Sequence, residues 1–375
     1  MNDSNFLKEI GRSYIVSAYL PAAIFLLLAY FLFRGFIPTI LLTQIAENTI
    51  FQKYQWIILF LLTLWLAFYL YSANDVTVRI FEGYKLPKRV FDALVEKKKE
   101  AVQALLDEIK EWKELDEGLK DKTEKEELIL EEDALKSTQM LMNIQTKMAN
   151  FGIKFPFNLE SVMPTRLGNV LRSSEMYAYE RYRIEEITIW PRLFNVLPVE
   201  FIRTLEEKHN HFMFLINSAF LAFVNALVGL AVAVVGVPVV IDPGFLRMNF
   251  PKLIGFFYIG FDYVGPLGYF FISLVLFGFG YILYSIAVNV AEDFSLYIRA
   301  SFDLYRVNLL RQMNWKPPKT IMEERDLWED FSRFLIASDR LGKVKIPEFR
   351  FADQEDEAEL QVLQVDDDAA KWPGR

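Results

Sequence analysis

The side chains that most often carry chemistry are scarce in this chain. Its 375 residues include no Cys and two His, His209 and His211. The absence of Cys excludes disulfides, thiolate metal sites and cysteine nucleophiles. The two His lie two positions apart in a stretch predicted to be helical, where such side chains point in different directions. No nucleophile, base and acid occur together at a usable spacing. We therefore expect no metal site, no cofactor and no enzymatic activity.

One polar and aromatic set in residues 151–200 is a candidate for binding a ligand or a protein partner. Thr165 is predicted to cap a helix that begins at Arg166, because its hydroxyl can accept a first-turn amide proton. Arginines near a helix start can hold a carboxylate or a phosphate. Alternatively, these arginines pair with Glu175, Glu180, Glu185 or Glu186. The candidates are Arg166, Asn169, Arg172, Trp190 and Arg192.

A second set consists of polar and small residues inside long apolar stretches. Asn217 and Asn225 lie eight residues apart, in a stretch that repeats small residues every four positions. Small residues let helices approach closely in lipid, and polar groups there face protein or a water-filled path. The set therefore indicates either tight helix packing or the lining of a pathway. Its members are Asn217, Ser218, Asn225, Gly229, Asp262, Ser273, Ser285 and Asn289.

The apolar stretches follow from how charge is distributed. The chain has 41 + 49 = 90 Lys, Arg, Asp and Glu, yet residues 13–74 hold three of them and residues 211–291 hold four. A bilayer core of about 30 Å needs about 20 apolar residues as a helix. Four stretches meet this length, at about 14–33, 54–71, 212–241 and 268–291. The fold class predicted is an all-α membrane protein with four transmembrane helices in two hairpins plus a helical cytoplasmic domain.

The predicted domains alternate between membrane and cytoplasm. They are a first transmembrane hairpin (1–74), a cytoplasmic helical domain (75–210), a second transmembrane hairpin (211–291) and cytoplasmic C-terminal helices with an acidic, disordered tail (292–375). Segment 253–267 is too short to span and is interpreted as re-entrant or interfacial. Near the span ends, one side holds 12 Lys and Arg and the other holds 4. The positive-inside rule then places both termini in the cytoplasm.

Several cytoplasmic segments have helical patterns. Residues 87–148 are predicted to form a helical hairpin or short coiled coil, broken near 116–125. Trp190-Pro191 is expected to interrupt helix, which resumes near Val199 and continues into the third span. The fourth span is expected to continue as helix until Trp315-Lys316-Pro317-Pro318, followed by a helix at about 322–338. The first hairpin is interpreted as an outer, lipid-facing pair because its second helix has almost no polar residue.

The formal net charge of −8 bears on partners. Nucleic-acid binding needs a basic face that neutralises phosphates, so we expect no nucleic-acid partner. The same balance argues against a general electrostatic attachment to an anionic membrane surface, although a local basic patch remains compatible with it.

The string PTRLGNVLRSSEMYAYERYRIEEITIWPRLFNVLP at 164–198 resembles a group of uncharacterised bacterial multi-spanning membrane proteins with Pro-Thr-Arg-Leu-Gly-Asn and Trp-Pro-Arg-Leu elements. The segment LYRVNLLRQMNWKPPKTIMEERDLW is similar to the C-terminal part of that group. Arg183 and Glu185 stand where the resemblance leads us to expect Gly and Asp. The resemblance implies a bacterial inner-membrane protein and no particular activity.

Two functions are compatible with these patterns. The first is an oligomeric channel or transport-like assembly of identical subunits, with the third and fourth spans central. The alternative is a membrane-anchored interaction or signalling module that does not conduct. The expected partners are the lipid bilayer, further copies of the chain and a cytoplasmic protein.

Overall fold

All regular structure in the computed structural model is helical, within the residues it describes: 13–33, 49–124, 131–235 and 266–336. This confirms the all-α part of the predicted fold class. The chain separates into two compact units. Unit 1 comprises Met1–Leu86 and Glu206–Ala291, and unit 2 comprises Pro87–Leu205 and Glu292–Arg375. Two long helices, α10 (Val199–Val235) and α13 (Pro266–Gln312), contribute residues to both units.

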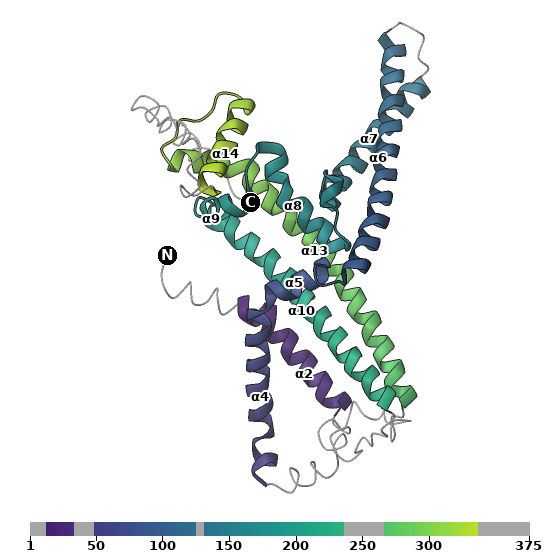
Figure 1. Ribbon diagram of the computed structural model, residues 1–375, viewed down its shortest axis with the longest axis vertical. Helices are drawn as coiled ribbons and strands as arrows, with labels where there is room; N and C mark the ends of the chain where they lie inside the picture. The colour runs from purple at the N-terminus through teal and green to yellow at the C-terminus, as the bar shows by residue number, and fades with distance from the viewer. Residues whose placement is uncertain (1–12, 34–48, 125–130, 236–265, 337–375) are drawn as a thin grey trace. The chain divides into compact units, whose positions relative to one another are not determined.

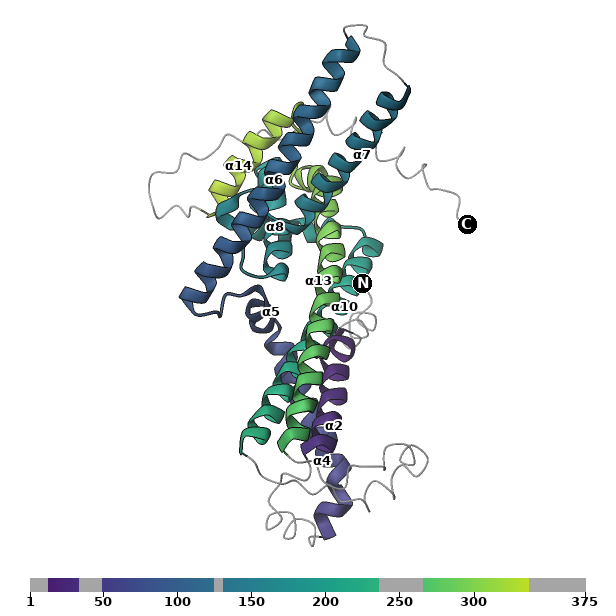
Figure 2. The same cartoon turned by 90° about the vertical axis from the view of Figure 1, so that its right-hand side faces the viewer.

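Unit 1 is a set of apolar helices that lie side by side (Figures 1 and 2). They are η1 (Ile15–Tyr19), α2 (Leu20–Phe33), α4 (Thr49–Ser72) and the unit 1 parts of α10 and α13. The short, polar α5 (Asn74–Glu82) follows α4 and is bent from it by 60°. Their shared core contains Ala18 and Ala22 of the first helix, Ala67 of α4 and Ala222 of α10, beside the larger Phe25, Leu70 and Leu221. The small residues allow the helices to approach closely.

The structure supports the four predicted spans in part. Two helices, Val199–Val234 and Gly268–Gln312, are long and apolar enough to cross a membrane. Trp56–Ser72 and Asn74–Glu82 pass the same test as a pair bent by 60°, and would give a third span. The first apolar helix, Ile15–Ala29, is shorter. Of the predicted re-entrant segment 253–267, residues 253–265 lie outside the described part of the chain, and α13 begins at Pro266.

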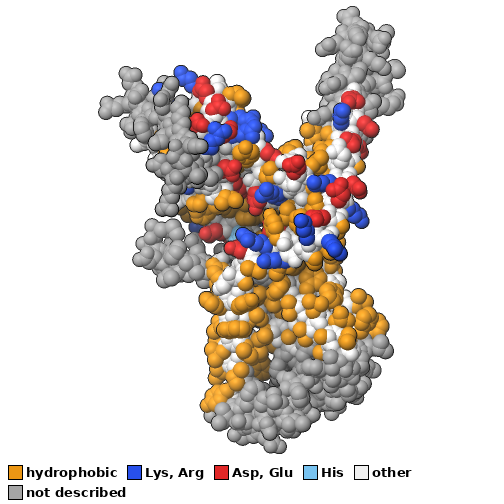
Figure 3. All heavy atoms as spheres, viewed as in Figure 1, with side chains coloured by type: hydrophobic (Ala, Val, Ile, Leu, Met, Phe, Trp, Pro, Cys, Tyr) orange, Lys and Arg blue, Asp and Glu red, His pale blue; other side chains and the backbone are white. Residues whose placement is uncertain are grey.

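The outer surface of α4 is hydrophobic along most of its length, as the orange side chains of Figure 3 illustrate. Trp65 and Phe68 are 68% and 65% exposed, and Trp56 and Phe60 are also exposed. A water-facing surface of this kind would be unfavourable, whereas lipid chains would cover it without cost. The prediction that α4 faces lipid agrees with this exposure.

Unit 2 contains the charged helices of the chain. They are α6 (Lys88–Glu124), α7 (Glu131–Lys154), η3 (Leu159–Ser161), α8 (Arg166–Tyr182), α9 (Glu186–Phe194), α14 (Ile321–Ile336) and the unit 2 parts of α10 and α13. The hairpin of α6 and α7 is confirmed, with Val102 and Ile109 packed against Phe151. The break predicted near 116–125 does not occur before Glu124. Helix α6 continues to that residue although its apolar pattern is lost.

A second core in unit 2 joins α8, α9, α13 and α14 around Leu193, Phe302 and Trp328. The cap at Thr165 is confirmed, since its Oγ1 accepts from the Gly168 amide over 2.9 Å. Helix α10 does begin at Val199, and α13 does continue as one helix to Gln312.

The predicted interruption at Trp190-Pro191 is wrong, because α9 runs through both residues. Proline lacks the amide that would bond to the Ile187 carbonyl. Ile187 is 82% exposed, so solvent is available to that carbonyl and the helix tolerates the proline.

Candidate functional site

Asn217 donates a hydrogen bond to the backbone of the first apolar helix. Pro21 has no N–H, so the carbonyl of Ser17, four residues earlier, lacks its α-helical donor. The chain there forms the π-helical stretch η1. The Nδ2 of Asn217, on α10, donates to the Ser17 carbonyl over 2.8 Å and to Oδ1 of Asn74 over 3.1 Å. Asn217 and Ser17 are both buried. The amide of Asn217 is therefore used in helix packing.

Other predicted polar residues of α10 and α13 are also turned inward. Nδ2 of Asn225 donates to the Phe25 carbonyl over 3.4 Å. Oγ of Ser273 donates to the Tyr269 carbonyl of its own helix over 2.7 Å. Ser218 is buried, and its Oγ has no hydrogen-bond partner within the described ranges. These contacts favour the packing interpretation of the set over the pathway interpretation.

The remaining members of this set do not join them on one surface. Gly229 is buried, Ser285 is partly buried and Asn289 is exposed. Asp262 lies outside the described residues. Since Asn217 and Asn225 face the first apolar helix while Asn289 is exposed, the described candidates share no common face.

The interpretation of the first hairpin as an outer pair stays a prediction for its first helix, which exposes Ile24 on one face and packs another against α10. Ala18 and Ala22 are buried in one cluster with Leu221 and Ala222 of α10.

Asn169, from the predicted cytoplasmic set, has a structural position. It is fully buried in the first turn of α8. Its Nδ2 donates to the carbonyls of Met163 and Thr165, each over 2.7 Å, and its Oδ1 accepts from the Met163 amide over 2.8 Å. This side chain fixes the backbone of residues 163–165 just before the helix, and its polar atoms are used in these three hydrogen bonds.

The other four residues of the predicted cytoplasmic set have separate environments. Arg166 is exposed, and Arg172 pairs with Glu175 over 3.1 Å, as the alternative interpretation predicted. Trp190 packs in the core of unit 2, and Nη1 of Arg192 donates to the carbonyl of Thr188 over 2.7 Å. The structure does not bring the five candidates together as a ligand site.

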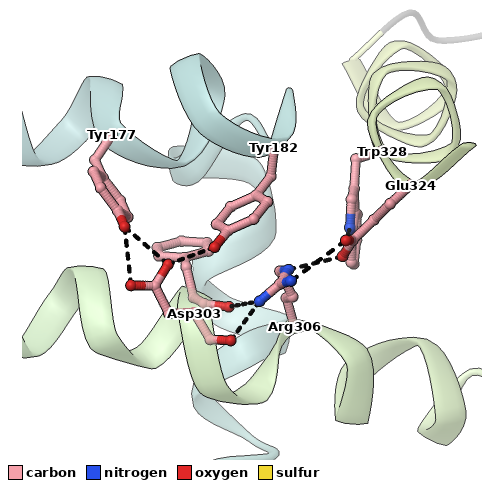
Figure 4. Close-up of polar contacts among 7 residues, drawn as sticks. Tyr177, Tyr182, Asp303, Arg306, Glu324 and Trp328 are labelled. Atoms are coloured by element: carbon pink, nitrogen blue, oxygen red, sulfur yellow. Dashed lines mark hydrogen bonds and ion pairs between the residues drawn. The ribbon is translucent and has the colours of Figure 1, made fainter. Parts of the chain in front are cut away.

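The most connected polar group in unit 2 was not predicted, and it surrounds Asp303 of α13 (Figure 4). The hydroxyl of Tyr177 donates to both Asp303 carboxylate oxygens over 2.9 Å, and the hydroxyl of Tyr182 donates to Oδ1 over 2.7 Å. Burial and the hydrogen bond to Asp303 raise the pKa of Tyr177 to about 12. One carboxylate thus ties the C-terminal part of α8 to α13.

Arg306, one helical turn further along α13, extends this group to α14. Its Nε donates to Glu324 over 2.8 Å, and its guanidinium lies 4.0 Å from the ring centroid of Tyr182. Nε1 of Trp328 also donates to Glu324, over 3.4 Å. Glu324 is buried and Arg306 is largely so, which makes this ion pair stronger than a surface pair. We call Tyr177, Tyr182, Asp303, Arg306, Glu324 and Trp328 the helix clamp.

A second polar group lies where α8, α9 and α13 meet. Arg299 is 8% exposed, and its Nη2 donates to Oγ of Ser173 over 2.9 Å. The pKa of Glu186, in the first turn of α9, is raised to about 8 by burial and then by the charge of Glu175, against the opposite effect of Arg299. Oε2 of Glu186 is buried and has no hydrogen-bond partner within the described residues. Burial thus moves the pKa of Glu186 into the range near neutral pH.

Sequence reasoning missed the helix clamp because its parts come from distant segments. Tyr177 and Asp303 are separated by 126 positions. The one local signal was the spacing of Asp303 and Arg306, which places an acid and a base on the same side of a helix. Their contacts hold helices together, and within the described ranges no group of three His, Asp or Glu could hold a metal ion.

No protein-family model matches this sequence, and the comparisons with curated proteins and with solved structures give no match either.

Proposed function

We propose that the protein is a multi-pass membrane protein whose apolar helices anchor unit 2 as a docking module for a protein partner. Two helices that are long and apolar enough to cross a membrane support the membrane part. With 1.5 Å per residue, the 37 residues of α10 extend about 55 Å and the 47 residues of α13 about 70 Å. Both exceed a bilayer core of about 30 Å, so their charged ends lie outside it.

The proposed topology has four spans, with the first apolar helix and α4 as the first hairpin. The asymmetry of 12 against 4 Lys and Arg supports placing both termini and unit 2 in the cytoplasm. The resemblance to bacterial multi-spanning proteins supports an inner-membrane location. Assembly into a homo-oligomer stays a prediction, as does the absence of enzymatic activity.

The observation that carries the choice between conduction and anchoring is the position of Asn217. A pathway residue would offer its amide to a passing solute or to water. Here the amide bonds to the backbone carbonyl of Ser17, and Asn225 also bonds to the first helix. The main polar groups that motivated a channel are thus used in packing, which supports the anchored module.

The α6 and α7 hairpin supports a docking role. Among its described side chains, the apolar contacts lie around Val102, Ile109 and Phe151. Further along α7 the described side chains are mostly exposed, including Met142 at 62%. Helices gain most of their stability from packing an amphipathic face, so the exposed apolar side chain of Met142 is suited to a partner that covers it.

Two measurements test this proposal. Purified protein in liposomes should pass no ions or small solutes above the rate of empty liposomes, and reproducible flux would refute the anchored module. In living cells, a photo-crosslinking amino acid at Met142 should give a discrete adduct with another protein. The same group at Trp65, on the exposed face of α4, should give lipid adducts, and adducts between copies there would support a homo-oligomer. No protein adduct at Met142 or its exposed neighbours would contradict docking.

A further inference from the structure

A strongly basic segment follows the apolar helix α4 in this otherwise acidic protein. Residues 79–89 contain four cations and one acid, Glu82, which gives a net charge of +3 in a chain of net charge −8. We call the four cations the basic elbow: Arg79, Lys85, Lys88 and Arg89. All four are exposed. Within the described residues, none of them forms an ion pair shorter than 4.0 Å.

The backbone of this segment is fixed by two residues. Helix α5 turns by 60° from α4 and ends at Gly83, whose φ of 99° is left-handed and favours glycine. The amides of Gly83 and Tyr84 bond to the carbonyls of Ile80 and Arg79, closing the end of α5. Pro87 then stands directly before α6 and accepts from the Val90 amide over 2.9 Å. Arg79 is therefore carried on α5, Lys85 on the turn that follows it, and Lys88 and Arg89 on the first turn of α6.

Apolar side chains are interleaved with these cations. Val76 and Ile80, one turn apart on α5, are 50% and 40% exposed, and Tyr84 is 52% exposed. Phe81 fixes α5 to unit 1 through ring contacts with Phe223 and Tyr284, at centroid distances of 6.1 and 5.6 Å. A short helix that exposes apolar residues beside Lys and Arg is the pattern of an element lying in the headgroup layer.

We propose that the basic elbow binds the anionic headgroups of the membrane leaflet that α4 enters. This rests on the proposed function to the extent that α4 lies in the membrane. Exposed cations without ion pairs complement phosphate groups, while the apolar side chains suit the boundary with the acyl chains. An acidic peptide would match the cations alone and would leave Val76, Ile80 and Tyr84 without an apolar environment.

The experiment uses the full-length protein in a non-ionic detergent, with bound lipid measured by native mass spectrometry. Phosphatidylglycerol and phosphatidylcholine are added at equal concentrations. The elbow variant carries Lys85→Gln, Lys88→Gln and Arg89→Gln. The control variant carries Lys97→Gln, Lys98→Gln and Lys99→Gln, which removes three positive charges two to three turns further along α6.

Wild type and the control variant should prefer phosphatidylglycerol. Each cation near an anionic surface contributes roughly fivefold, so the elbow variant should lose of order 100-fold in that preference. Equal loss in both variants, or no loss in the elbow variant, would overturn the proposal. Competition by inorganic phosphate at the lipid concentration would also overturn it, because it would show a phosphate site without a need for membrane. Extraction of wild type from membranes by alkaline carbonate would instead refute the membrane location itself.

Discussion

The bond between Asn217 and the Ser17 carbonyl makes a specific energetic prediction. If Asn217 replaces the donor that Pro21 lacks, then Asn217→Ala should cost more stability when residue 21 is proline than when it is alanine. A buried carbonyl left without its donor costs about 1–3 kcal/mol in proteins generally, and hydrogen bonds between membrane helices average about 0.6 with a maximum near 1.7 kcal/mol. Ser17 and Asn217 are 1% and 0% exposed, so the effect belongs in the upper part of the membrane range.

The measurement is a double-mutant cycle on the full-length protein, with unfolding by sodium dodecyl sulfate in mixed micelles followed by tryptophan fluorescence. We expect a coupling free energy of about 1–1.5 kcal/mol between Pro21→Ala and Asn217→Ala, since the alanine amide can serve the Ser17 carbonyl. Loss of the second bond of Asn217, to Asn74, occurs in both backgrounds and cancels.

Asn225→Ala is the matched control for this cycle. Asn225 bonds to the Phe25 carbonyl, and the residue four positions later, Ala29, has its own N–H. Pro21→Ala should therefore show no coupling with Asn225→Ala beyond about 0.5 kcal/mol. The reasoning would be refuted if Asn217→Ala cost the same in both backgrounds, or if both asparagines coupled equally with position 21.

Three further predictions concern other parts of the protein. Between the ordinary pKa of 4.5 and the raised value of about 8, folded Glu186 holds a proton that the unfolded chain has lost, so stability should fall by up to about 1.4 kcal/mol per pH unit as pH rises through that window. Glu186→Gln should remove this slope in thermal unfolding from pH 5 to 9, and an unchanged slope would show that Glu186 is ionised when folded. Gly280→Ala should be less stable than Gly278→Ala by about 1 kcal/mol. A Cβ at 280 would lie 3.0 Å from the Phe223 ring, whereas one at 278 would meet nothing within 4 Å. Equal melting temperatures of the two variants would contradict this packing. Arg306→Gln should cost about 3 kcal/mol, because it leaves a buried carboxylate without its cation, and a loss below 1 kcal/mol in chemical unfolding would count against the helix clamp.

The parts of the fold that the sequence predicts are those set by local periodicity. The start of α10 at Val199, the continuation of α13 and the cap at Thr165 all depend on residues within a few turns of one another. The prediction at Trp190-Pro191 was wrong because proline was expected to end the helix. Ile187 is exposed, so its carbonyl, which has no proline amide to accept from, can bond to solvent instead.

The sites were less predictable, because their partners are distant in the chain. Asn217 was identified as a polar residue inside an apolar stretch, but its partner lies 200 positions away and is a backbone atom. Which carbonyl needs a donor is visible locally at Pro21, while the helix that supplies the donor is decided only by packing. Tyr177 and Asp303 had no such local sign, because tyrosine and aspartate on charged helices usually face solvent.

The pairing of Pro21 with Asn217 also has a consequence for biosynthesis. A ribosome that adds about 5–20 residues per second makes Asn217 about 10–40 s after Ser17, since 200 positions separate them. During that interval, the first helix of the proposed topology enters the membrane without the side-chain donor that Asn217 later supplies to its Ser17 carbonyl. The first helix would then stay at the lateral exit of the insertion machinery, or beside another polar helix, until α10 arrives. Its release into lipid would become a timed step, set by the length of the segment between the two helices.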